Sequence, residues 1–159
     1  MLYAITHYWQ AVAACARADY DLAYQSFDVG VRIGRAMNNV PSTAHPLSAL
    51  GRMLVQRNQL GDATIAVTML TEALELHRSS EDRWGIAGCF EGLAGAALAL
   101  GEPARTVRLL GAAHALRESI SAPLPPAERI DLEGKQEAAR SALGEAAFLR
   151  AWSEGSNFR

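Results

Sequence analysis

The sequence has few of the residues on which simple functional assignments depend. Only two of its 159 residues are cysteines, Cys15 and Cys89, so we expect buried free thiols in a reducing cytoplasm, without a disulfide framework. Aromatic residues make up only 7% of a chain rich in alanine and leucine, which favours helices over sheets. The net charge is −2 with acids and bases interspersed, so direct nucleic-acid binding is not expected.

The sequence also lacks a recognisable export or membrane-spanning segment. Residues 1–18 are apolar, but they have no basic leader and include several polar and aromatic side chains, unlike a signal peptide. A second apolar run contains Gly88 and Gly92 in the Gly-x-x-x-Gly spacing of membrane helix pairs. That run has only about 17 residues and carries Glu91 near its middle, so we do not expect it to cross a membrane.

No catalytic or metal centre is recognisable. Neither cysteine has a histidine close by in sequence that would act as its base. His77 with Glu81, and His114 with Glu118, lie four residues apart, but two ligands do not complete a metal site. We therefore expect solvated side-chain pairs, no cofactor, no metal and no enzymatic activity, while a pairing of distant residues in space stays open.

A strip of glycines is the most informative feature that is present. Gly85, Gly88, Gly92 and Gly95 follow one another at steps of three and four, so on a helix they share one face. Each glycine costs a helix about 1 kcal/mol relative to alanine. The strip therefore predicts a helix against which a neighbouring main chain packs closely, and so a stack of helices.

Self-similarity supports a helical repeat. Gln59-Leu60-Gly61-Asp62 recurs forty positions later as Ala99-Leu100-Gly101-Glu102. A weaker, earlier copy is Arg17-Ala18-Asp19-Tyr20, in which Ala18 lies forty-three positions before Gly61. An apolar helix in the same phase follows each copy. The sequence predicts three helix-turn-helix repeats at about 2–40, 42–80 and 82–121, with Ser42 or Thr43 capping the first helix of the second repeat.

The prolines at Ala122-Pro123-Leu124-Pro125-Pro126 interrupt this pattern and predict a rigid bend. A helix rich in charged residues follows, with Ile130, Leu132, Ala139 and Leu143 expected on its inner face. Gly144 separates it from a short last helix. We interpret 126–155 as a capping hairpin that covers the end of the stack, so that 1–159 forms one helical repeat domain.

These residues resemble two known groups of proteins. The pattern Gly-(Asp/Glu)-x-x-x-Ala-x-x-x-(Leu/Phe) resembles tetratricopeptide (TPR) repeats, although the period here is longer than theirs. Several segments are also similar to the C-terminal TPR-like region of large bacterial signal-transducing ATPases, which carry LuxR-type DNA-binding or nucleotide-cyclase domains. These segments are Asp82-Arg83-Trp84-Gly85-Ile86-Ala87, Glu91-Gly92-Leu93-Ala94-Gly95, Arg108-Leu109-Leu110-Gly111-Ala112-Ala113, 122–129 and 143–155.

The resemblance implies an all-α fold, a right-handed TPR-like superhelix of antiparallel hairpins. It also implies a cytoplasmic, non-catalytic arm that binds a protein, a peptide or a small effector and regulates an attached ATPase or transcriptional regulator. The chain contains no Gly-x-x-x-x-Gly-Lys-(Ser/Thr) sequence, so ATPase activity and DNA binding are not carried over. The alternative is a structural protein whose exposed helical ends drive self-association, for example into a homodimer.

Two sets of residues are candidates for partner contacts. In TPR stacks the first helix of each repeat lines the concave wall, and repeat phase places Tyr8, Val12, Ser48, Val55 and Glu91 there. Tyr3, Tyr8 and Trp9 form an aromatic cluster that is a candidate end-docking surface. Trp84 could stack on a ligand, but we favour packing for Trp84 and for Trp152 in the end cap. We likewise favour the interpretation that Gly51, Gly88 and Gly95 only let neighbouring helices approach one another.

Overall fold

The computed structural model describes residues 2–157, and side chains from residue 6 onward. The side chain of Tyr3 lies outside this described part. Within it the fold is all-helical, with eight α-helices and no strand. The helices are α1 (Leu2–Ala16), α2 (Tyr20–Ala36), α3 (Val40–Arg57), α4 (Asp62–Ser79), α5 (Arg83–Ala99), α6 (Pro103–Ser119), α7 (Pro126–Leu143) and α8 (Glu145–Ser156).

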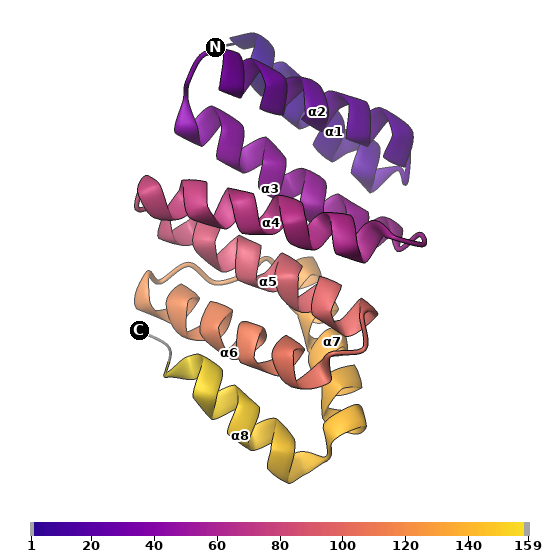
Figure 1. Ribbon diagram of the computed structural model, residues 1–159, viewed down its shortest axis with the longest axis vertical. Helices are drawn as coiled ribbons and strands as arrows, with labels where there is room; N and C mark the ends of the chain where they lie inside the picture. The colour runs from indigo at the N-terminus through magenta and orange to yellow at the C-terminus, as the bar shows by residue number, and fades with distance from the viewer. Residues whose placement is uncertain (1, 158–159) are drawn as a thin grey trace.

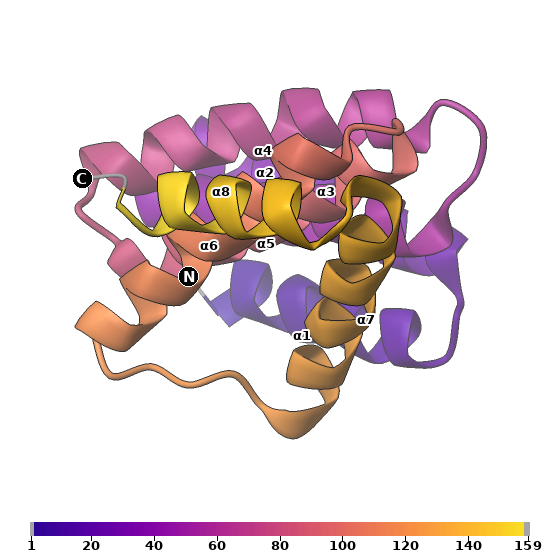
Figure 2. The ribbon, with the colours of Figure 1, turned by 90° about the horizontal axis from the view of Figure 1, so that it is seen from below.

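The first six helices form a stack in chain order (Figure 1). Each packs on its neighbour in sequence, and α3 also packs on α5. Two helices depart from this order. α7 runs across the stack and contacts α5, α6 and α8, while α8 lies along α6 as the last layer (Figures 1 and 2). The capping segment is thus a crossing helix followed by a stacked one.

Left-handed residues close the corners between the helices. Ala18, Asn38, Glu81 and Gly101 have φ values of 57°, 49°, 55° and 76° in three-residue connections. In each, the next N–H donates to a carbonyl five residues back, as a Schellman turn requires. Gly61 is also left-handed, but its corner, 58–61, has four residues. The two glycine corners are therefore similar in role and differ in length.

The start of α3 differs from the prediction. Asn39, and neither Ser42 nor Thr43, caps the helix, and its Oδ1 accepts a hydrogen bond of 2.9 Å from the N–H of Ser42. Asparagine is a strong N-cap, and Pro41 fits in the first turn because the amides there have no partner within the helix. The helix therefore starts two residues before the predicted cap.

The glycine strip is buried, as predicted, but what packs against it differs. Gly85, Gly88, Gly92 and Gly95 face side chains of His77, Arg52, Leu70 and Val55, so α5 accommodates side chains where we expected a main chain. Close contacts between a glycine and a main chain occur instead between α6 and α8. A Cβ on Gly111 of α6 would lie 2.7 Å from the carbonyl of Trp152, and one on Gly155 of α8 would overlap the carbonyl of Arg108.

Apolar side chains fill the space between the layers. One cluster joins α1 to α5 around Phe27, Leu50 and Leu70, and another joins α6, α7 and α8 around Val107 and Phe148. On α7 the prediction for Ile130 was wrong, because this residue is 66% exposed, while Ala139 is buried. None of the eight helices described is long and apolar enough to cross a membrane.

Candidate functional site

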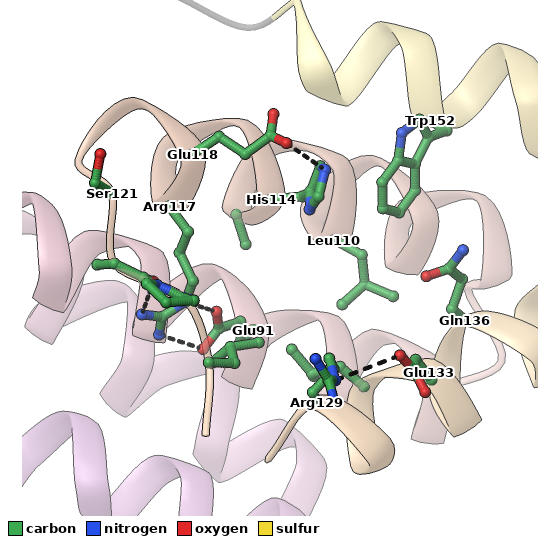
Figure 3. A pocket seen from close by; sticks show the side chains of 15 residues that line it. Glu91, Leu110, His114, Arg117, Glu118, Ser121, Arg129, Glu133, Gln136 and Trp152 are labelled. Atoms are coloured by element: carbon green, nitrogen blue, oxygen red, sulfur yellow. Dashed lines mark hydrogen bonds and ion pairs between the residues drawn. The ribbon is translucent and has the colours of Figure 1, made fainter. Parts of the chain in front are cut away.

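A pocket of about 660 Å³ opens where the repeat pattern ends (Figure 3). α6 ends at Ser119, and residues 120–125 lead away from the stack before α7 turns back across it (Figure 2). Pro123, Pro125 and Pro126 are three of the chain's six prolines. Because proline fixes the backbone and cannot donate a hydrogen bond, this connection does not collapse into a helix against α6. The pocket lies between α5, α6, this connection, α7 and α8.

A buried ion pair closes the floor of the pocket. Arg117 of α6 binds Glu91 of α5 through both carboxylate oxygens, with Nη2 2.9 Å from Oε2 and Nε on Oε1. The hydrogen bonds that Arg117 donates to Glu91 raise the pKa of Arg117, and Nη1 of Arg117 also donates to the carbonyl of Ala122 at 3.5 Å. The guanidinium also lies over the Trp84 ring, 5.8 Å from its centroid. The two opposite charges leave the floor without net charge.

Apolar side chains form most of the pocket wall. Leu110 points into the cavity from α6, and Trp152 faces it from α8 (Figure 3). Trp152 is held by stacking on Phe148, with ring centroids 6.0 Å apart. The remaining apolar lining consists of Ala113, Ala122, Pro123, Leu124 and Leu132. Such a wall binds apolar groups of a ligand by excluding water.

Charged pairs surround the mouth of the pocket. His114 Nε2 lies 3.4 Å from Glu118 Oε1, and Arg129 Nε lies 3.8 Å from Glu133 Oε1. All four side chains are more than half exposed, so the expectation of a solvated His114–Glu118 pair is confirmed. Together with Gln136 they offer hydrogen bonds to the polar end of a ligand.

Of the predicted wall residues, Glu91 alone lines this pocket. Glu91 is only 4% exposed and is paired with Arg117. Val55 packs against Gly95, and the Ser48 hydroxyl donates to the carbonyl of His45. Of the five, only Val12 is exposed.

The aromatic residues of α1 lie at the other end of the stack. Tyr8 makes edge contacts with Trp9 and Phe27, and Trp9 is 62% exposed. Both line a second hollow of about 300 Å³ with Pro41, Pro46 and His45. Their part in docking stays a prediction.

The cysteines do not form a nucleophilic centre. Cys89 is buried, and burial raises its pKa to about 12, so it stays a thiol. Cys15 is only partly buried, unlike the prediction, because α1 is the outermost helix of the stack and only one of its faces is covered by another helix.

The sequence pointed to the bend but not to the pocket. The prolines marked the place, whereas the lining comes from helices that are close only in space. His77 was paired in sequence with Glu81, yet in the structure its partner is Asp82, at 2.8 Å, with His45 beside them.

Comparison of the chain with protein families, with curated proteins and with solved structures finds no match.

Proposed function

We propose that this chain is a non-catalytic sensor module that holds a small, mainly apolar effector in the pocket between α5, α6, α7 and α8. The observation that carries the proposal is the pocket itself. Its volume of about 660 Å³ falls within the range of roughly 300–1,000 Å³ typical of ligand sites. An apolar wall with a few polar groups at its mouth is also typical of such sites.

The lining favours a particular kind of ligand. The charges of Arg117 and Glu91 neutralise each other, so the pocket floor has no net charge that would favour or disfavour a charged ligand. Leu110, Leu132 and Trp152 offer apolar contact area. We therefore favour an uncharged ring or short aliphatic group at depth, with a hydrogen-bonding group directed to the mouth.

The position of the pocket suggests how binding is transmitted. Its lining joins the stack to α7, whose attachment to α3 is the exposed pair Arg52–Glu128, with Nη2 and Oε2 2.9 Å apart. A ligand that contacts α6, α7 and α8 together favours the arrangement in which these helices are close. The helical hairpins would form a right-handed, TPR-like superhelix, and the resemblance suggests an attached cytoplasmic ATPase or transcriptional regulator as the receiver of this signal.

The proposal is tested by filling the pocket. The probe is 8-anilinonaphthalene-1-sulfonate, titrated against the wild-type chain and followed by its own fluorescence. Gln136→Trp places a bulky ring in the pocket, whereas Ala138→Trp adds the same ring to an exposed position on the same helix. Near-ultraviolet circular dichroism verifies that each variant is folded.

The expected result is saturable binding of one probe molecule, weakened at least tenfold by Gln136→Trp and unchanged by Ala138→Trp. Equal affinity in all three chains would show that the probe does not enter the pocket, and the proposal would then be abandoned. Turnover of a substrate that depends on one of the chain's histidines or cysteines would equally remove the non-catalytic role.

Self-association is the second candidate, because Trp9 leaves most of its ring exposed at the end of the stack. A second copy docking there would cover it. Light scattering tests this: a dimer of the wild-type chain that dissociates in Trp9→Lys, but not in the matched Leu149→Lys variant of exposed α8, would support assembly. A monomeric wild-type chain would rule it out.

A further inference from the structure

Three side chains from consecutive elements meet beside the first turn of α5. His45 comes from the second turn of α3, His77 from the last turn of α4, and Asp82 is the N-cap of α5. Oδ2 of Asp82 lies 2.8 Å from Nδ1 of His77 and 3.5 Å from Nε2 of His45. The three potential ligand atoms all lie within 4.8 Å of one another.

The surroundings leave these atoms directed at each other. The other oxygen of Asp82 accepts a hydrogen bond of 3.0 Å from the N–H of Gly85, which fixes the carboxylate and leaves Oδ2 for another partner. His77 is fully buried, and its Nδ1 faces Oδ2 of Asp82. Gly85 makes the space: a Cβ there would overlap the His77 ring and lie 2.6 Å from Oδ2.

We propose that His45, His77 and Asp82 bind a divalent metal ion of the zinc class. Zinc binds histidine nitrogen at about 2.0–2.1 Å and carboxylate oxygen at about 2.0–2.2 Å, so tetrahedral ligands lie roughly 3.4 Å apart. The separations of 2.8 and 3.5 Å from Oδ2 of Asp82 lie on either side of this value. Two nitrogens and one oxygen favour zinc, cobalt or nickel over magnesium and calcium, which prefer oxygen ligands.

Metal binding needs neutral imidazole and ionised carboxylate, so zinc competes with protons for all three groups. A simple hydrogen bond joins His77 to Asp82, and the His45 ring packs edge-on against His77, with centroids 4.9 Å apart, so that all three groups are already in contact.

The site lies apart from the effector pocket and has a different consequence. The metal joins α3 to α4 and to the start of α5, and so fixes the second predicted repeat to the third. Three protein ligands leave one position for water or for a donor from a partner. The side chain of His45 is 40% exposed, so the ion can enter and leave from solvent.

The experiment titrates the apo chain with Zn²⁺ by calorimetry and follows its thermal midpoint. We expect one ion per chain and a rise of about 5–10 °C when free zinc is a hundred times its Kd. Co²⁺ should give the visible absorption of a tetrahedral site, while Mg²⁺ at the same concentration should shift nothing.

Matched variants locate the ion. His45→Ala removes an exposed ligand and Asp82→Asn removes ligand charge while keeping an oxygen for the cap, so both chains should fold and lose at least tenfold in zinc affinity. His114→Ala removes an exposed histidine that also has a carboxylate neighbour and should bind zinc as the wild type does. The proposal is overturned if the wild type binds no zinc, if His45→Ala binds it unchanged, or if His114→Ala is weakened equally.

Discussion

Arg117 of α6 donates hydrogen bonds to both carboxylate oxygens of Glu91 on α5, and the pair closes the floor of the pocket. Both side chains are almost completely buried, so each charge depends on the other for the interactions that water would supply. The carbonyl of Ala122 and the ring of Trp84 add further contacts to the guanidinium. The pair therefore joins the third repeat to the proline-containing connection.

Glu91→Ala should lower the free energy of unfolding by about 3–5 kcal/mol, because it leaves the Arg117 guanidinium buried and unpaired. The double variant Glu91→Leu/Arg117→Met removes both charges and should lose much less. Urea denaturation of Glu91→Leu, Arg117→Met and this double variant gives the coupling energy. Additive losses would contradict the interpretation that the pair acts as a unit.

An exposed pair provides the control for this cycle. Arg52 and Glu128 join α3 to α7 at 2.9 Å, but both side chains are more than a third exposed. Glu128→Ala should therefore cost no more than about 1 kcal/mol. A loss as large as that of Glu91→Ala would mean that burial does not set the cost of breaking these pairs.

Gly155→Ala should destabilise the chain by about 2–3 kcal/mol, since the new methyl group overlaps the main chain of α6 at Arg108. Gly134→Ala is its matched control. Gly134 lies in the middle of exposed α7 with no atom close to the position of a Cβ, so alanine there should stabilise by about 0.5–1 kcal/mol. Thermal unfolding measures both, and equal effects of the two changes would contradict close packing of α6 on α8.

The order and bounds of the helices could be predicted from the sequence because they depend on local signals. The apolar period and the bend at Pro123 to Pro126 act over a few residues. The cap of α3 was misplaced because Asn39, Val40 and Pro41 were assigned to the end of the preceding helix. At this connection the local signals did not separate the end of α2 from the start of α3.

The pocket and the histidine cluster could not be predicted in this way, because they depend on which faces meet. Glu91 was placed on an open wall from repeat phase, but α6 presents Arg117 to it and buries both. His45 and His77 are 32 positions apart and meet through the packing of α3 on α4. The glycine strip similarly predicted a close contact but assigned it to a main chain, whereas side chains make it.

Acid should weaken the corner between α3 and α4 through Asp62. Its carboxylate accepts hydrogen bonds of 2.9 and 2.7 Å from Arg57 and one of 2.9 Å from the N–H of Gln59. The bonds from Arg57 lower the pKa of Asp62 below its ordinary value. The carboxylate therefore contributes stability that is present above the unfolded pKa of about 3.9 and is lost as the pH falls through the lower folded value.

The comparison of wild type with Asp62→Asn isolates this contribution. At pH 7 the variant should be less stable by about 1–2 kcal/mol, and the difference should shrink towards zero between about pH 4 and pH 2. Urea denaturation at each pH measures it. Asp28→Asn, in an exposed pair with Arg32, should show no comparable trend, and a difference that does not change with pH would contradict the role of Asp62.

Ala18→Gly should stabilise the chain by about 0.5–1 kcal/mol. Ala18 is exposed at the corner between α1 and α2 with φ of 57°, where a Cβ costs about 1–2 kcal/mol, partly offset by the greater freedom of glycine in the unfolded chain. Ala13→Gly, on the exposed side of α1, should destabilise by about 1 kcal/mol because helical φ values favour alanine. If the thermal midpoint rises in Ala18→Gly and falls in Ala13→Gly, the left-handed backbone at residue 18 determines the effect of the substitution. If it falls in both variants, the backbone conformation at residue 18 does not determine the effect.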